Sequence, residues 1–187
     1  KAQEIIDYAM SHGINYYDTA YIYHGGESES FTGDALVKYP RSSYNLATKF
    51  NVMATTDYRI VFEEQLKKLK TDYIDFYLIH GIFDNNIDQY INIGAVDYFA
   101  EQKEAGRIRN LGFSSHASVQ GLERFVKLRD WDFAQIQMNY LDWTLQDAKS
   151  QYELLTKYNI PVIVMEPVRG GKLASLSPES DAILKEA

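Results

Sequence analysis

Residues 14–29, INYYDTAYIYHGGESE, combine a short apolar and aromatic run with the polar groups that follow it. The run at 14–18 suits a buried β-strand, and Gly13 before it is a typical helix C-cap. Asp18 ends the run, Tyr23 follows five residues later, and a His-Gly-Gly loop leads into a helical pattern. A carboxylate at the carboxyl end of a strand, with a phenol in the next loop, is where α/β proteins commonly place their chemistry.

The same pattern of an apolar run followed by a helical segment continues along the chain. We expect strands at residues 14–18, 44–49, 73–79, 108–113, 133–138 and 161–165. Helical spacing of apolar residues predicts helices at 2–12, 27–37, 57–69, 89–105, 118–128 and 145–158, and the start of another within 177–187. This alternation predicts parallel strands joined by right-handed crossovers.

Two α/β architectures have this alternation, an open doubly wound sheet and a (β/α)8 barrel. A polar residue follows every predicted strand: Asp18, Lys49, His80, Ser114, Asn139 and Glu166. Such a series is typical of a barrel, in which all the strand-to-helix loops share one mouth. No GxGxxG follows any strand, as a dinucleotide-binding doubly wound sheet would require. We therefore expect an incomplete (β/α)8 TIM barrel that forms a single domain over residues 1–187.

Composition excludes several classes of function. Of the 187 residues, 45% are hydrophobic and 24% are charged, which is typical of a soluble globular protein. A net charge of −7 argues against a general binder of nucleic acid or anionic membranes, although it allows a local basic pocket for one phosphate group. The absence of cysteine excludes a disulfide, a thiol nucleophile or a cysteine-ligated metal, and fits a cytoplasmic location.

Targeting segments are not visible in the sequence. No run approaches the roughly 18 apolar residues of a membrane span, and no signal peptide can be recognised. The helical patterns at Lys1 and Ala187 are interrupted by the chain ends. We therefore expect both ends to be cuts within a longer protein.

Four side chains, Asp18, Tyr23, Lys49 and His80, would meet at one rim of a barrel. A tyrosine has a pKa of about 10, and a nearby ammonium lowers that pKa by stabilising the phenolate. A buried lysine keeps its proton only if a carboxylate holds it, and a histidine beside the phenol can orient a carbonyl. This set suits protonation of a carbonyl oxygen while hydride arrives at carbon.

Other interpretations of these residues stay open on the sequence pattern alone. Asp18 and Lys49 also suit a structural ion pair, and His80 a hydrogen-bonded group that ends a strand. With 15 tyrosines in the chain, one of them beside a lysine is not diagnostic. A metal-assisted hydrolase would need more ligands than His80 with Asp18 or Glu166, so we expect no metal.

Several stretches resemble the aldo-keto reductase family. DTAYIYHGGESE (18–29) is similar to the signature in which Asp, Tyr, Gly and Ser-Glu open the second barrel unit. ATK (47–49) and DYIDFYLIHG (72–81) are similar to the segments with the family's catalytic lysine and histidine. The resemblance continues through IRNLGFSSH (108–116), AQIQMNY (134–140) and VIVMEPVRGGKLA (162–174), so it covers nearly the whole chain.

The resemblance implies catalytic roles for the first four residues. Tyr23 is expected to be the general acid, with Lys49 and Asp18 as the pair that sets its pKa and His80 as the group that orients the substrate. The implied reaction is the NAD(P)H-dependent reduction of an aldehyde or ketone to an alcohol. The alternative is a non-catalytic cofactor-binding barrel that acts as an accessory subunit, which would not need all four residues.

The resemblance also implies cofactor contacts. Ser114 and Gln135 match residues that hold the nicotinamide carboxamide, whereas Ser115 stands where the family has asparagine. Met165 stands where an aromatic often stacks on the nicotinamide, so a thioether contact is expected instead. Arg169, in the loop after the last strand, is a candidate partner for a cofactor phosphate.

The matched segments correspond to the family's second to seventh strands. The first strand and the eighth unit, which holds the adenosine 2′-phosphate, have no counterpart, so NADPH is expected from the resemblance and NADH is the alternative. MEPVRGGKLA (165–174) is similar to a bacterial and archaeal branch that often carries a C-terminal iron–sulfur domain. Such a cluster would require a domain after Ala187. The sequence does not specify the carbonyl substrate.

Overall fold

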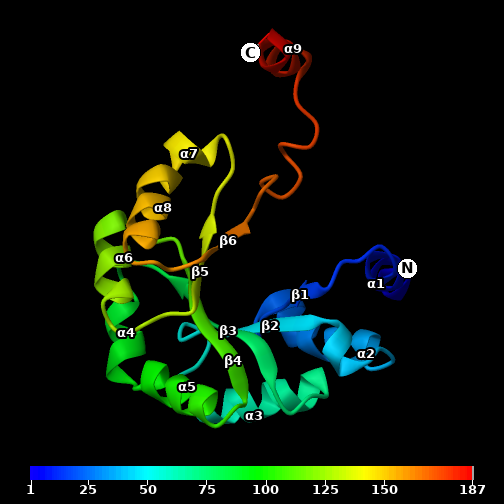
Figure 1. Ribbon diagram of the computed structural model, residues 1–187, viewed down its shortest axis with the longest axis vertical. Coiled ribbons are helices and arrows are strands. Elements are labelled where there is room, and N and C mark those ends of the chain that lie inside the picture. The colour runs from blue at the N-terminus through cyan, green and yellow to red at the C-terminus, as the bar shows by residue number, and fades with distance from the viewer. Residues whose placement is uncertain (187) are drawn as a thin grey trace.

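Six parallel strands form the centre of the computed structural model, which describes residues 1–186 (Figure 1). They are β1 (Tyr16–Asp18), β2 (Asn45–Phe50), β3 (Ile74–Ile82), β4 (Ile108–Ser115), β5 (Phe133–Gln137) and β6 (Val162–Met165). The strands are hydrogen-bonded in sequence order, without the reversal of order that defines a doubly wound sheet. The sheet curls into part of a barrel with helices outside it, which confirms the predicted incomplete (β/α)8 architecture.

The helices lie outside this sheet, and most of them cover its convex side. They are α1 (Ala2–Ser11), α2 (Ser28–Leu36), α3 (Tyr58–Leu69), α4 (Ile87–Asn92), α5 (Ala95–Glu104), α6 (Val119–Val126), α7 (Asp142–Leu145), α8 (Ala148–Lys157) and α9 (Pro178–Glu186), with 3₁₀ turns η1 (Tyr23–Gly26) and η2 (Arg41–Ser43). Figure 1 shows α2 to α8 in an arc around the strands, while α1 and α9 lie away from them. Neither α1 nor α9 contains a buried residue.

Two predicted helices are wrong in their extent. The segment 89–105 forms two helices, because Gly94 between them has a φ of 74°, which a residue without Cβ adopts readily. The segment 145–158 begins as α7 and continues as α8 after Asp147, whose φ is 52°. Both interruptions turn the chain between a strand end and the helix that packs behind it.

Two predicted strands continue further than their apolar runs. β3 extends to Ile82 and β4 to Ser115, so His80 and Ser114 are strand residues rather than loop residues. Their polar side chains stop the apolar pattern but not the parallel ladder, because backbone hydrogen bonds do not depend on the side chain. β1, in contrast, is confined to three residues.

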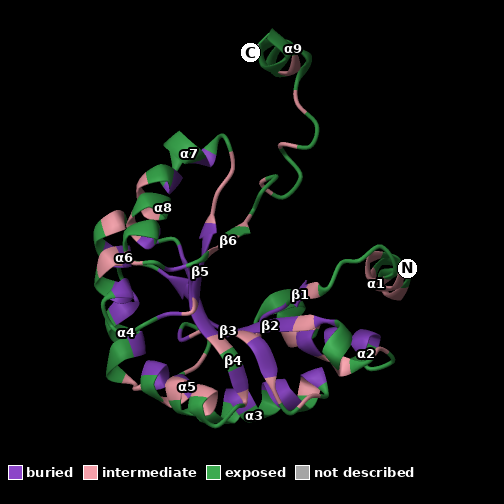
Figure 2. Cartoon of the chain, viewed as in Figure 1, coloured by how far each residue is buried: buried purple, intermediate pink, exposed green. Residues whose placement is uncertain are grey.

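Successive side chains of each strand point to opposite faces of the sheet, and this separates two apolar regions. The larger core lies between the sheet and the helices and includes the fully buried rings of Phe50, Tyr77 and Phe113 (Figure 2). A smaller cluster on the concave face contains Ala47, Leu78 and Phe133, with Tyr16, Phe76 and Ile163 packed against it. Because side chains alternate with a period of two, polar residues occupy the next inward positions toward the carboxyl ends: Asp18, Lys49, His80, Ser114 and Gln135.

Candidate active site

A cavity of about 240 Å³ lies at the carboxyl ends of the strands, above the concave apolar cluster. It is lined by Asp18, Tyr23, Lys49, His80, Ser114, His116, Gln135, Gln137, Met165 and Glu166. Each of the six strands or the loop after it therefore contributes at least one group. Seven of the nine residues predicted for the site line this cavity, and the two that do not are Ser115 and Arg169.

Lys49 is the buried cation of the cavity. It projects from β2 with only 1% of its surface exposed. Its Nζ donates hydrogen bonds to Asp18 Oδ1 and, at 2.8 Å, to the Thr19 carbonyl oxygen. Burial lowers the pKa of Lys49, and the Asp18 carboxylate opposes that change. Asp18 therefore holds the ammonium in place, as the sequence pattern predicts.

Tyr23 belongs to η1, the turn that follows β1, and it lies over the other polar groups of the cavity. Its ring meets the His80 ring edge-on, with centroids 5.6 Å apart and an interplanar angle of 81°. Lys49 Nζ is 4.9 Å from the centroid of the Tyr23 ring. The left-handed backbone of His24 and Gly25 returns the chain toward α2 immediately after Tyr23. Tyr23 thus lies against both the histidine and the lysine.

The net pKa of Tyr23 is raised in this structure, not lowered as the sequence pattern predicts. Burial, followed by the charges of Asp18 and Glu166, raises the pKa of Tyr23 to about 12. The physical reason is that burial disfavours the charged phenolate, and the carboxylates of Asp18 and Glu166 add to that effect. Tyr23 consequently keeps its proton at neutral pH.

A β-bulge directs His80 into the cavity. The pairing of β3 with β4 shifts between Ile79 and Ile82, where Gly81 has a φ of 64°. The Gly81 N–H donates to Ser114 Oγ at 2.8 Å, and the Tyr90 hydroxyl donates to the His80 carbonyl oxygen at 2.6 Å. These bonds to β4 and α4 fix the peptide unit that joins His80 to Gly81.

The His80 imidazole lies in surroundings that favour its neutral form. Burial, followed by the charges of Lys49 and His116, lowers the pKa of His80 to about 3. Its Nδ1 is buried and makes no hydrogen bond within residues 1–186. A neutral imidazole has one N–H donor and one acceptor nitrogen, so His80 can donate a hydrogen bond without carrying charge.

Three predicted cofactor contacts line the opposite wall. Ser114 on β4 is paired in register with Gln135 on β5, and Met165 ends the neighbouring strand β6. Ser114 Oγ accepts the Gly81 N–H, which leaves its own hydroxyl proton free to be donated. The wall therefore presents a hydroxyl, an amide and a thioether side by side.

Two predicted contacts point elsewhere. Ser115 follows Ser114 in the strand, so alternation turns its side chain away, and its Oγ accepts the Ala117 N–H at 3.1 Å. Arg169 Nε is 3.3 Å from Oδ2 of Asp142, a fully buried carboxylate that also accepts a hydrogen bond from Gln137 at 2.9 Å. In this structure Arg169 connects the loop after β6 to α7.

His116 and Gln137 line the cavity although the sequence pattern did not select them for it, and Glu166, expected only among the polar residues that follow the strands, lines it too. Gln137 lies two positions after Gln135 on β5, so counting by two from the predicted amide would have found it. His116 stacks on Phe83 in the loop after β3, with ring centroids 5.3 Å apart. Such a contact between two loops has no signal in the sequence.

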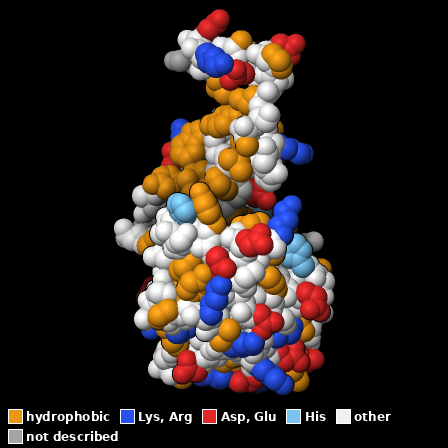
Figure 3. Space-filling model, turned by 90° about the vertical axis from the view of Figure 1, so that its right-hand side faces the viewer, with side chains coloured by type: hydrophobic (Ala, Val, Ile, Leu, Met, Phe, Trp, Pro, Cys, Tyr) orange, Lys and Arg blue, Asp and Glu red, His pale blue; other side chains and the backbone are white. Residues whose placement is uncertain are grey.

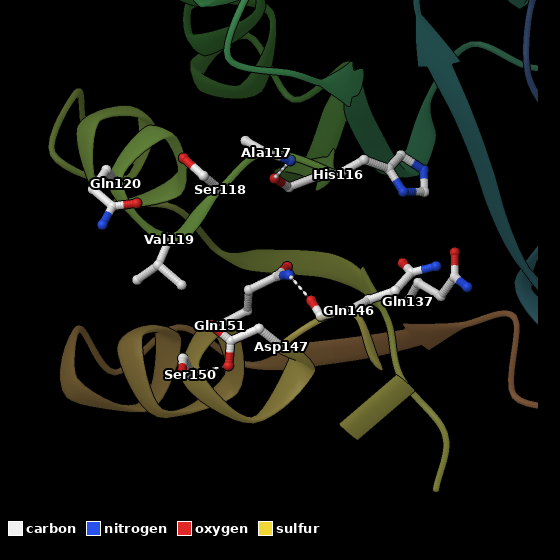
Figure 4. A pocket seen from close by; sticks show the side chains of 11 residues that line it. His116, Ala117, Ser118, Val119, Gln120, Gln137, Gln146, Asp147, Ser150 and Gln151 are labelled. Atoms are coloured by element: carbon white, nitrogen blue, oxygen red, sulfur yellow. Dashed lines mark hydrogen bonds between the residues drawn. The ribbon is translucent and has the colours of Figure 1, made fainter. Parts of the chain in front are cut away.

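A polar groove of about 600 Å³ adjoins the cavity between α6 and α8 (Figure 4). Its lining includes Ser118, Gln120, Gln146 and Gln151, and it shares His116 and Gln137 with the cavity. The groove therefore extends the same polar region outward from the barrel rim.

Within residues 1–186, no three metal-ligating side chains lie close enough to hold one ion. None of the helices in this part of the chain combines the length and apolarity needed to cross a membrane.

Comparison with known proteins places this half-barrel among the α/β-barrel oxidoreductases. The chain belongs to the aldo/keto reductase family, whose model matches residues 1–185. It is 31% identical to the uncharacterized oxidoreductase YqkF of Bacillus subtilis over 186 residues, which cover 92% of this chain and 58% of that protein. The chain spans about half to two thirds of the length of the first curated relatives it matches.

Solved structures show the same relationship. An aldo/keto reductase from Brucella melitensis is 27% identical with a TM-score of 0.74, covering 99% of this chain and 69% of its own. The holo form of aldo-keto reductase AKR11C1 from Bacillus halodurans is 30% identical with a TM-score of 0.75, covering 95% of this chain and 61% of its own. The strand order and curvature described above are thus those of a known barrel family.

Proposed function

We propose that this protein reduces an aldehyde or ketone to an alcohol, using a nicotinamide cofactor and Tyr23 as the proton donor. The observation that supports this most strongly is the convergence of Tyr23, the Lys49–Asp18 pair and His80 in one cavity of a chain from the aldo/keto reductase family. A purely structural ion pair would not need a phenol beside it, or an imidazole whose Nδ1 has no hydrogen-bond partner within residues 1–186.

The opposite wall of the cavity fits a nicotinamide. The Ser114 hydroxyl and the Gln135 amide supply the donors and acceptors that match a carboxamide, and the Met165 thioether is a polarizable surface for a flat ring. A bound nicotinamide would supply the hydride. We propose NADPH as the cofactor, from the family resemblance, with NADH as the alternative.

In the proposed reaction, the proton is donated by the chain's own residues. Tyr23 is protonated at neutral pH because its pKa is raised to about 12, so it can donate to a carbonyl oxygen as negative charge develops there. The Lys49 ammonium, 4.9 Å from the ring centroid, favours the phenolate that remains, and Asp18 keeps Lys49 charged. His80 is neutral and positions the carbonyl oxygen by donating a hydrogen bond.

Substitution of Tyr23 tests this proposal. In the full-length protein, Tyr23→Phe keeps the ring but removes the proton, so we expect kcat for carbonyl reduction to fall by about 10² or more, the scale of general acid catalysis. NADPH binding, followed by fluorescence, should be retained. Tyr21→Phe is the matched control, since Tyr21 lies two residues away and outside the cavity. Near-normal turnover by Tyr23→Phe would refute the assignment.

A further inference from the structure

A second polar cluster is buried behind the cavity, on the helix-facing side of β2. It contains Glu29 from α2, Thr48 from β2, Gln65 from α3 and Tyr77 from β3, all with 0% of their surface exposed. Thr48 Oγ1 and Gln65 Nε2 donate hydrogen bonds to Glu29 Oε1, the latter at 2.7 Å. The Tyr77 hydroxyl donates to Gln65 Oε1 at 2.6 Å. The proposed reaction uses none of these four groups.

This cluster is joined to the strand that carries Lys49. Gln65 Nε2, which contacts Glu29, also lies 3.0 Å from the Lys49 carbonyl oxygen. Thr48 immediately precedes Lys49, and alternation turns the Thr48 side chain to the helices and the Lys49 side chain to the cavity. The Glu29 carboxylate is therefore separated from the catalytic cavity by the thickness of one strand.

Packing alone does not explain a carboxylate at this position. An apolar side chain would fill the same space without losing the hydration of a charge. Glu29 Oε2 accepts no hydrogen bond within residues 1–186, and Lys68 Nζ, on the partly exposed side of α3, is 3.8 Å away. Glu29 Oε2 therefore acts on its surroundings through charge and not through a hydrogen bond.

We propose that Glu29 is a positioning residue for Lys49, which fixes β2 through Thr48 and Gln65 and supplies a negative charge, in addition to that of Asp18, that keeps the ammonium ionised. The proposal rests on the proposed function, in which the Lys49 charge assists Tyr23. Burial lowers the pKa of Lys49, and the charges of Asp18 and then Glu29 oppose that change. Burial raises the pKa of Glu29, which its bonds with Thr48 and Gln65 and the charges of Lys68 and Lys49 oppose.

The ionisable groups around this pair come from several elements. Lys49 faces Asp18 from β1, Tyr23 from η1 and His80 from β3. Glu29 interacts with Tyr21 after β1, Lys68 from α3 and Tyr77 from β3. Removing the Glu29 charge leaves all of them in place, so a change in Lys49 can be assigned to Glu29.

The test is Glu29→Gln in the full-length protein, which keeps the shape and the oxygen that accepts from Thr48 but removes the charge. We expect the Lys49 titration, followed by NMR of lysine labelled with ¹³C at Cε, to move to lower pH by about one unit, a tenfold change in its acid constant. The alkaline limb of kcat against pH should move with it. Tyr77→Phe is the control, because it removes one hydrogen bond of the cluster, keeps the Glu29 charge and its bonds, and should leave that limb in place.

An unchanged Lys49 titration in folded Glu29→Gln would overturn the proposal. If the variant does not fold, the wild-type protein labelled at the glutamate carboxyl carbon gives the answer, because a Glu29 that is protonated at pH 7 carries no charge and cannot act in this way. Failure of the wild-type protein to reduce any carbonyl would instead refute the proposed function. The Lys49 titration does not depend on turnover, so the two failures are distinguishable.

Discussion

At the scale of single residues, His80 makes the stability of the fold depend on pH. Its pKa is lowered to about 3 in the folded protein and is about 6.5 in an unfolded chain, so the unfolded state binds more protons between these values. Stability therefore falls as pH drops below 6.5. The linkage relation gives a loss of about 2 kcal/mol between pH 7 and pH 5 from this group.

Urea unfolding at pH 7 and pH 5 measures this loss, and His80→Gln should remove His80's share of it. His12→Gln is the matched control, since His12 is exposed at the end of α1 and should leave the pH dependence unchanged. NMR of the imidazole provides a direct measurement. A His80 titration midpoint near 6.5 in the folded protein would contradict the prediction.

At the scale of elements, β4 and β5 approach each other closely at Gly112. A Cβ built on Gly112 would lie 2.5 Å from the Phe133 carbonyl oxygen and 2.6 Å from its ring. We expect Gly112→Ala to destabilise the protein by about 1–3 kcal/mol through overpacking, measured by denaturant unfolding. Gly112→Ala combined with Phe133→Leu should recover part of that loss, because it removes the ring that the methyl group meets. Equal stability of Gly112→Ala and wild type would show that the strands can separate at no cost.

The strands and most of the cavity could be predicted because their signals are local. Apolar runs that end in a polar residue placed Asp18, Lys49 and His80 at one rim, and pairing of neighbouring parallel strands then brings them together. The bulge at Gly81 could not be predicted from the sequence, since it depends on the register between β3 and β4.

The other features of the site depend on the alternation of side chains along the strands and on contacts between distant segments. Ser114 and Ser115 are identical in type, and only the extension of β4 through both residues turns one into the cavity and the other away. The ion pair of Arg169 with Asp142 joins the loop after β6 to α7, so no local pattern indicates it. The raised pKa of Tyr23 likewise follows from burial and from Glu166, a residue of the loop after β6.

At the scale of the whole molecule, burial decreases from the centre of the sheet to its far edge. The central strands β2, β3 and β4 are largely buried, whereas every residue of β6 is partly or fully accessible and Val164 is 39% exposed. Figure 3 faces the open side of the half-barrel and shows hydrophobic side chains gathered on it. The last helix, α9, has no buried residue.

We expect this gradient to govern local opening in the chain of residues 1–187. Amide exchange, measured by mass spectrometry, should be slowest in β3 and β4 and faster in β6 and α9 by about 10² or more, because strands with few buried neighbours open without global unfolding. The mass of the protein in solution must be determined in the same sample. Protection of β6 equal to that of β3 in a monomer would contradict the prediction, whereas the same protection in a dimer would show that β6 pairs with a second copy through its free edge.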